Sequence, residues 1–243
     1  MKSVRSINSN IKLLPVVELP STEGKANRAL IVLHGWGANQ HDLIPLAQSL
    51  KLPNLHCFFP NAPFDVPGTG GKGKGWFSFP PTDKSQEERR ESREKLKRLL
   101  KKVSEEGFNY SSIIIMGFSQ GAAMALDVML NTEHRVGAVV ALSGFLMNEG
   151  DVRPQSNNLI KTPVFAAHGL YDPILPFEHS KRSLQALKDA GFNLTWREYQ
   201  MAHEIVPEEV DAIKNFLSNT CLLYTSDAAD DTPCVDLGGR RII

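Results

Sequence analysis

The chain has few cysteines, no excess of either charge and no long apolar run, and each absence excludes a class of protein. Three cysteines in 243 residues are too few for a disulfide framework, and no pair of them has the spacing of metal ligands. Lys and Arg together number 27, as do Asp and Glu, so the charge favours neither nucleic acid nor anionic lipid as a partner. No stretch reaches the ~20 apolar residues of a membrane span, and the polar start of the chain lacks the apolar centre of a signal peptide. We therefore expect a cytoplasmic protein without stable membrane insertion, in which Cys57 is a buried free thiol.

The chain does contain the ordinary mixture of residues of a folded domain. Hydrophobic residues make up 42% and charged residues 22%, and the length suits one α/β domain. Strand-like and helix-like segments alternate, which predicts a mostly parallel central sheet with helices on both faces. The expected strands are residues 11–19, 29–33, 55–59, 112–116, 136–142, 164–167 and 194–199. The expected helices are residues 42–50, with Asp42 as a candidate N-cap, 85–106, 122–130, 177–190 and 207–217.

Two segments have a distinctive composition. Residues 66–75 contain five glycines and two lysines, which predicts a flexible loop that could form a rim of the active site. In the expected helix 85–106, four apolar residues recur at helical spacing and predict one stripe that packs on the sheet. These residues are Leu96, Leu99, Leu100 and Val103.

The C-terminal segment 221–243 fits none of the expected elements. It resembles a translated sequencing adapter, so we expect an α/β domain over residues 1–220 followed by a non-native or disordered tail. A native C-terminal strand or a tail that binds a partner is the alternative.

The most informative motif is Gly117-Phe118-Ser119-Gln120-Gly121, which lies between an expected strand and an expected helix. In that setting Gly-x-Ser-x-Gly is typical of the nucleophile elbow of an esterase-like site. The serine must occupy a sharp turn so that its hydroxyl projects from the sheet, and the glycines remove the Cβ atoms that would clash there. A serine in an ordinary tight turn is the alternative. We predict that Ser119 is a catalytic nucleophile.

A serine hydroxyl needs a base to take its proton, and the base needs a carboxylate to orient it. With an elbow of this kind, the chain order is serine, acid, histidine. His179 and His203 come late enough, and we favour His203 because it lies in a loop after the last expected strand, whereas His179 falls inside a helix. Asp172 follows a strand and precedes a proline, which makes it the favoured acid, with Glu149 and Asp151 as alternatives.

Two backbone N–H groups are expected to stabilise the oxyanion. One belongs to Gln120, the residue after the nucleophile, and the other belongs to the loop after strand 29–33, where Trp36 is the candidate. His34, at the start of that loop, is expected to be a structural histidine that braces it.

The motifs occur together in the order that one known family has. They are Leu33-His34-Gly35-Trp36-Gly37, Phe59-Pro60-Asn61-Ala62-Pro63, Gly75-Trp76-Phe77, the elbow, Leu142-Ser143-Gly144, His168-Gly169 with Asp172, and His203. Over residues 11–217 the chain resembles the phospholipase/carboxylesterase family of α/β-hydrolases, which includes bacterial carboxylesterases and acyl-protein thioesterases. The glycine- and lysine-rich segment is where it departs most from the acyl-protein thioesterases.

The resemblance implies an α/β-hydrolase fold and a triad of Ser119, Asp172 and His203, with Trp36 and Gln120 as oxyanion donors. It also implies that Trp76 and Phe77 line the acyl pocket, although Trp76 could instead be an aromatic residue that anchors the loop. The implied chemistry needs no metal and no cofactor.

The expected activity is hydrolysis of carboxylic esters through an acyl-enzyme. Thioesters and lysophospholipids remain open as substrates, and the alternatives are an amidase or peptidase and a non-catalytic ligand-binding hydrolase. About twenty residues separate the strands 136–142 and 164–167, too few for a helical cap domain. We therefore expect an open site for a small acyl ester, in a monomer or homodimer.

Overall fold

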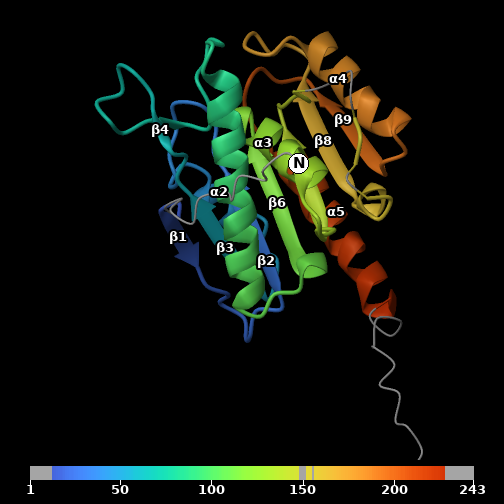
Figure 1. The fold of residues 1–243 in the computed structure, drawn as a ribbon. Coiled ribbons are helices and arrows are strands. Elements are labelled where there is room, and N and C mark those ends of the chain that lie inside the picture. The colour runs from blue at the N-terminus through green and yellow to red at the C-terminus, as the bar shows by residue number, and fades with distance from the viewer. Residues whose placement is uncertain (1–12, 148–151, 155, 228–243) are drawn as a thin grey trace, which may run out of the picture.

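A seven-stranded sheet forms the centre of the protein (Figure 1). The structure is a computed structural model that describes residues 13–147, 152–154 and 156–227, with side chains up to residue 220. In spatial order the strands are β1 (Val16–Leu19), β3 (Leu55–Pro60), β2 (Arg28–Leu33), β6 (Ile113–Phe118), β7 (Ala138–Leu142), β8 (Val164–Gly169) and β9 (Leu194–Tyr199). The edge strand β1 is antiparallel to β3, and all other neighbouring strands of this sheet are parallel. The expected mostly parallel sheet is confirmed.

Helices cover both faces of the sheet. The helices α2 (Ser85–Glu105), α3 (Gln120–Asn131) and α4 (Phe177–Asp189) share one core with one face of the sheet. On the other face, α1 (Ile44–Ser49) and α5 (Pro207–Asp227) enclose a second core. Strands covered on both faces need apolar residues throughout, and β2, β6 and β7 are accordingly almost entirely buried.

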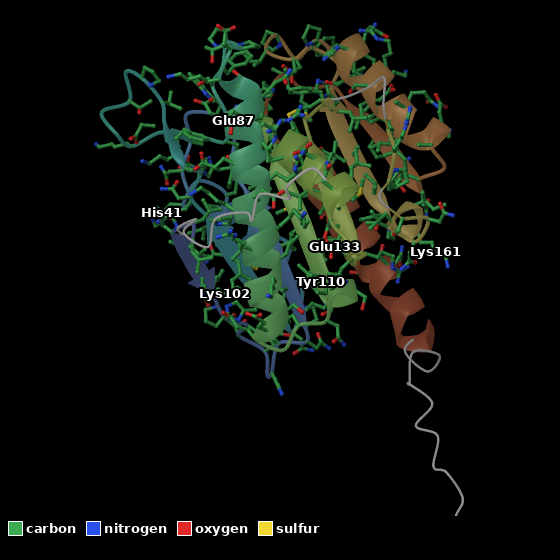
Figure 2. The ribbon with its side chains drawn as sticks, in the orientation of Figure 1. His41, Glu87, Lys102, Tyr110, Glu133 and Lys161 are labelled. Atoms are coloured by element: carbon green, nitrogen blue, oxygen red, sulfur yellow. The ribbon has the colours of Figure 1, made fainter. Side chains whose placement is uncertain are left out.

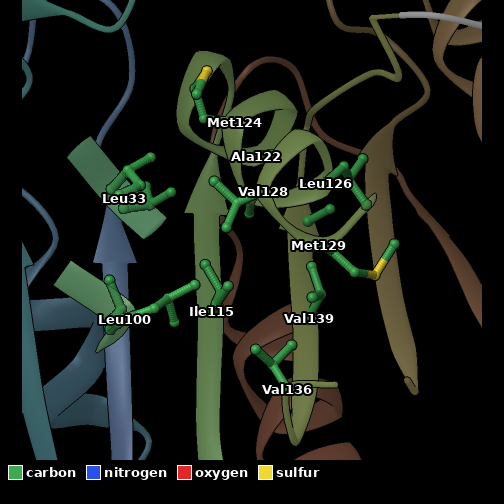
Figure 3. Close-up of a cluster of buried hydrophobic side chains, with 14 of the residues drawn as sticks. Leu33, Leu100, Ile115, Ala122, Met124, Leu126, Val128, Met129, Val136 and Val139 are labelled. Carbon is green, nitrogen blue, oxygen red and sulfur yellow. The ribbon is translucent and has the colours of Figure 1, made fainter. Parts of the chain in front are cut away.

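The helix α3 lies at the centre of its layer and packs on β6, which leads into the Ser119 turn, and on the neighbouring strand β7. Figure 3 shows Val128 and Met129 of this helix next to Ile115 of β6 and Val139 of β7. Each of these side chains is at most 2% exposed, and burying one apolar side chain of this size stabilises the fold by about 1.5–3 kcal/mol. The helix that directly follows Ser119 is therefore held firmly.

The long charged helix α2 buries the apolar stripe that its sequence predicts. Leu96, Leu99, Leu100 and Val103 are all at most 3% exposed. Polar side chains such as Glu87 and Lys102 extend from the helix in Figure 2. The helix ends before Gly107, whose φ of +106° suits glycine at a helix C-terminus.

Several element boundaries differ from the expected ones. The strand β1 begins only at Val16; part of its expected range lies outside the described residues, and Pro15 has no N–H for a strand ladder. Asp42 does not cap α1, because its carboxylate accepts a hydrogen bond from the N–H of Asn39 at 2.9 Å and the helix starts at Ile44. The helix α5 continues past Leu217 to Asp227, so the backbone does include part of the C-terminal segment.

The glycine-rich segment 66–75 is a structured hairpin rather than a loop throughout. The strands β4 (Phe64–Asp65) and β5 (Lys74–Gly75) pair antiparallel, and the connecting turn extends from the body in Figure 1. A Cβ atom on Gly73 would lie only 2.4 Å from the carbonyl oxygen of Gly37. Gly73 therefore permits a close contact between two backbone segments. The glycine-rich composition of residues 66–75 does not reveal whether a glycine serves such a contact or makes the loop flexible.

The segment between β7 and β8 contains, among its described residues, only the short 3₁₀ turn Leu159–Lys161. No helix in the described part of the chain is long and apolar enough to cross a membrane. Cys57 is a buried free thiol as expected, and burial raises its pKa to about 11.

Candidate active site

Ser119 occupies the sharp turn between β6 and α3. Its φ of 56° and ψ of −120° are unusual for a residue with a side chain, which marks a strained backbone. A Cβ atom on Gly117 would lie 2.2 Å from the carbonyl oxygen of Gly121, and one on Gly121 would lie 2.1 Å from that of Leu33. The glycines on either side are therefore required by the close approach of strand and helix, as the motif predicts.

The loops after β8 and β9 are joined side by side. The N–H of Leu170 donates to the carbonyl of Tyr199 at 2.9 Å, and the N–H of Tyr171 donates to that of Met201 at 3.1 Å. These bonds continue the parallel pairing of β8 with β9 past the ends of the strands. They bring the turn with Asp172 next to the turn with His203.

The three residues predicted from the sequence meet at this edge of the sheet. Nε2 of His203 lies 2.9 Å from Oγ of Ser119, and Nδ1 of His203 lies 2.6 Å from Oδ2 of Asp172. An ionised carboxylate can only accept, so Nδ1–H donates to Asp172 and Nε2 is free to accept the serine proton. The ring of Phe118 lies 4.9 Å from the imidazole of His203, centroid to centroid, and supports it.

The rejected alternative base lies elsewhere. His179 is on α4, next to Arg182 and Phe145, whereas His203 contacts Ser119 itself. The alternative acids Glu149 and Asp151 fall outside the described residues.

Asp172 is held by donors on both of its oxygens. Oδ1 accepts the N–H groups of Ile174 at 2.8 Å and Leu175 at 2.9 Å, while Oδ2 faces His203 and also Nε2 of His168 at 3.3 Å. Burial alone would raise the pKa of this carboxyl, but the hydrogen bonds outweigh it and leave the pKa below its ordinary value. Asp172 is therefore ionised at neutral pH and suited to orient an imidazole.

His168 was not predicted to take part in the site. It is fully buried, and its Nε2–H donates to the carbonyl of Leu175 at 2.9 Å, which joins the two ends of the Asp172 turn. Burial lowers its pKa, so it is a neutral hydrogen-bond donor rather than a base. Its place in the His168-Gly169 motif, directly at the end of a strand, was the available signal.

An apolar pocket of about 260 Å³ opens beside Ser119 and His203. Its remaining lining residues are mostly aromatic or aliphatic: Trp36, Phe77, Phe79, Gln120, Phe145, Ile174 and Leu175. A pocket of this lining suits a hydrocarbon chain whose polar end reaches the serine. A larger pocket of about 360 Å³ between β9 and α5 contains none of the predicted site residues.

The two candidate oxyanion donors lie close to Ser119. Gln120 begins α3, where the first backbone N–H groups have no partner within the helix. Trp36 lies in the turn after β2, and a Cβ atom on the neighbouring Gly35 would be 3.5 Å from Cβ of Ser119. Both residues line the same pocket as the serine. His34 braces this turn as expected, because Nδ1 donates to the Gly35 carbonyl at 2.8 Å and Nε2 accepts from Ala62 at 3.1 Å.

Trp76 and Phe77 are both expected in the wall of the acyl pocket, but only Phe77 lies there. Phe77 lines the pocket, but Trp76 is 0% exposed and is not among the lining residues. The expectation that Trp76 lines an acyl pocket is therefore wrong in this structure. Its indole packs instead against His34, with ring centroids 5.4 Å apart, and its Nε1–H donates to the carbonyl of His34 at 2.9 Å.

No group of three or more His, Cys, Asp or Glu side chains within the described residues is arranged to hold a metal ion. At the pocket, Ser119, His203 and Asp172 form one hydrogen-bonded series of side chains.

Known proteins are similar to this chain over most of its length. Residues 15–221 match the family model of phospholipases and carboxylesterases. The chain is 33% identical to acyl-protein thioesterase 1 of Debaryomyces hansenii, over 86% of this chain and 97% of that protein. It is 32% identical to acyl-protein thioesterase 1 of Saccharomyces cerevisiae, over 80% and 93% respectively. Among solved structures, that of esterase PE8 is similar with a TM-score of 0.74 and 26% identity, covering 86% of this chain and all of the other. The chain therefore belongs to the phospholipase/carboxylesterase family and has the α/β-hydrolase fold.

Proposed function

We propose that this protein hydrolyses carboxylic esters through an acyl-enzyme on Ser119, with His203 as base and Asp172 as the residue that orients it. Membership of the family makes the chain a carboxylic ester hydrolase. The observation that carries the assignment of roles is the unbroken series of contacts from Ser119 through His203 to Asp172, at 2.9 and 2.6 Å, beside an apolar pocket.

In the first half of the reaction, Oγ of Ser119 attacks the carbonyl carbon while its proton passes to Nε2 of His203. The imidazolium that forms is stabilised by the ionised Asp172. The same proton then passes to the leaving alcohol or thiol, which departs and leaves an acyl-serine.

In the second half, His203 takes a proton from water, and the resulting hydroxide equivalent attacks the acyl-serine. The acid product leaves and the proton returns to Ser119. In both halves the carbonyl oxygen becomes negatively charged, and we assign its stabilisation to the backbone N–H groups of Trp36 and Gln120.

We infer that the substrate presents its acyl chain to the pocket formed by Phe77, Phe79, Phe145 and their neighbours. The pocket selects for the acyl part rather than the leaving group, so both oxygen esters and thioesters fit the proposal. Support for thioesters comes from curated relatives that are named acyl-protein thioesterases. The chain would act on a small acyl substrate as a cytoplasmic monomer or homodimer without a nucleic-acid partner.

The test is the initial rate of hydrolysis of p-nitrophenyl butyrate by the wild type and by Ser119→Ala. We expect the variant to lose more than about 10³-fold in kcat, because the residual rate comes only from binding and the oxyanion donors. Ser111→Ala, which alters an exposed serine, is the matched control and should keep full activity. Turnover by Ser119→Ala close to that of the wild type would refute the proposal.

A further inference from the structure

We propose that Trp76 is a positioning residue that holds the two oxyanion donors in place. This inference rests on the proposed function, because it concerns the backbone N–H groups of Trp36 and Gln120. Trp76 is 0% exposed and lies behind the pocket, out of reach of the acyl chain. Its three polar groups bond to three different elements of the fold.

The first bond fixes the turn that carries Trp36. The indole Nε1–H of Trp76 donates to the carbonyl of His34 at 2.9 Å. Residues 74–77, the segment that contains Trp76, are also paired with the other end of that turn. The N–H of Gly37 donates to the carbonyl of Lys74 at 2.9 Å, and the N–H of Lys74 donates to that of Ala38 at 2.8 Å. Trp36 is thus enclosed between bonds on both sides.

The second contact fixes Gln120. The backbone N–H of Trp76 donates to Oε1 of Gln120 at 2.8 Å, and Nε2 of Gln120 donates to the carbonyl of Phe77 at 2.8 Å. The side-chain amide of Gln120 therefore pairs with the backbone much as a neighbouring strand would. This pair of bonds restricts Gln120, whose own backbone N–H is one of the two proposed oxyanion donors.

The third bond anchors the segment to the helix layer. The hydroxyl of Ser92, a fully buried residue of α2, donates to the carbonyl of Trp76 at 2.5 Å. Residues 74–77 therefore connect the turn after β2, the start of α3 and the middle of α2. The two donors come from separate parts of the chain, and this segment is a direct link between them.

Such a link affects the transition state more than the bound substrate. An oxyanion donor acts on charge that develops during attack, and a misplacement of about 1 Å can lower the rate by roughly 10²-fold. Ground-state binding depends on the pocket wall instead. A loss of positioning should lower kcat while KM stays nearly unchanged.

The experiment compares Trp76→Phe with the wild type. Phenylalanine keeps a buried ring but removes the N–H that bonds to His34. We expect kcat for p-nitrophenyl butyrate to fall about tenfold and KM to change less than about twofold, because only transition-state stabilisation is reduced.

A trifluoromethyl ketone inhibitor gives a second readout. Ser119 adds to its carbonyl carbon, the serine proton passes to His203, and the ketone oxygen becomes an oxyanion that the same donors must hold. The affinity for this inhibitor should fall by the same factor as kcat, since it resembles the transition state.

Tyr110→Phe is the control. It removes one polar group from a half-buried aromatic ring that stacks on His134, with ring centroids 4.1 Å apart, away from the pocket. We expect its kcat and inhibitor affinity to equal those of the wild type.

Two results would overturn the inference. One is a Trp76→Phe enzyme with wild-type kcat and inhibitor affinity; the other is a change confined to KM that grows with acyl chain length, which would make Trp76 a pocket wall. If Trp76→Phe does not fold, Ser92→Ala decides: a roughly threefold fall in kcat at constant KM supports the inference, and an unchanged kcat overturns it. Failure of the proposed function can be told apart from failure of this inference, because in that case the wild type itself would show no hydrolysis that depends on Ser119.

Discussion

Nδ1 of His203 lies 2.6 Å from Oδ2 of Asp172, although 31 positions separate the two residues in the chain. The contact exists because β8 and β9 are parallel neighbours whose hydrogen bonding continues into the loops that follow them. The fold thus delivers a buried, ionised carboxylate to one side of the imidazole and a serine to the other.

Asp172→Asn should preserve the fold but remove most of the activity. The amide oxygen can still accept the N–H groups of Ile174 and Leu175, but an amide N–H facing His203 would favour the wrong tautomer. We expect kcat to fall about 10³- to 10⁴-fold, as for a misoriented imidazole. Steady-state kinetics measures the loss, and a thermal midpoint close to that of the wild type shows that the fold is retained. A variant with more than a tenth of wild-type kcat would contradict the role of Asp172.

Phe77→Ala should alter the dependence of the rate on acyl chain length. The side chain lines the pocket beside Ser119, and its removal deletes apolar contact that only a longer acyl chain reaches. We expect kcat/KM for an eight-carbon p-nitrophenyl ester to fall about tenfold and that for the two-carbon ester to fall less than about threefold. Equal losses for the two esters would indicate that Phe77 does not contact the chain.

Glu209→Gln should make the protein more stable at alkaline pH. Glu209 is fully buried, and burial raises the pKa of its carboxyl to about 8 despite a weaker opposing effect of the Val206 backbone. The unfolded chain releases this proton near its ordinary pKa, whereas the folded chain keeps it until about pH 8. Folding stability therefore declines as the pH rises through this window, by at most about 1.4 kcal/mol per pH unit.

Urea unfolding at pH 5, 7 and 9 measures this effect. The stability of Glu209→Gln relative to the wild type should rise from pH 5 to pH 9, while the exposed neighbour Glu208, changed to Gln, should give no such trend. A difference between Glu209→Gln and the wild type that does not vary with pH would show that Glu209 is not protonated in the folded protein.

A chain that ends at Thr220 should keep full activity. The buried residues that dock α5, Ile213 and Leu217, precede this point, and the family match ends at residue 221. The backbone helix continues to Asp227, so a small decrease in thermal midpoint is compatible with the prediction. A large loss of folding or turnover on truncation would show that the tail is a native part of the domain.

Much of this site could be predicted from the sequence because its constraints are local. The elbow requires glycines at 117 and 121 whatever surrounds it, and the chain order of serine, acid and histidine narrows the partners of Ser119. The parallel sheet follows from buried apolar runs that alternate with helices.

The contacts that the sequence did not reveal depend on packing between distant segments. The pattern Gly75-Trp76-Phe77 does not specify which aromatic ring faces the pocket, because that depends on how Gln120 and Ser92 bond to the backbone there. The glycines of the segment 66–75 likewise predict a flexible loop, although Gly73 is needed for the close contact with Gly37. The role of His168 is not visible in the sequence, because its bond to Leu175 closes a turn whose shape only the fold defines.

The site of covalent labelling by a fluorophosphonate tests the central claim most directly. The reagent is attacked by a serine whose proton a neighbouring base accepts, so it reports the whole arrangement in one modified peptide. We predict a single adduct on Ser119 in the mass spectrum of the digested wild type, and loss of that adduct in His203→Ala. An adduct on another serine, or labelling of Ser119 at an undiminished rate without His203, would contradict the account.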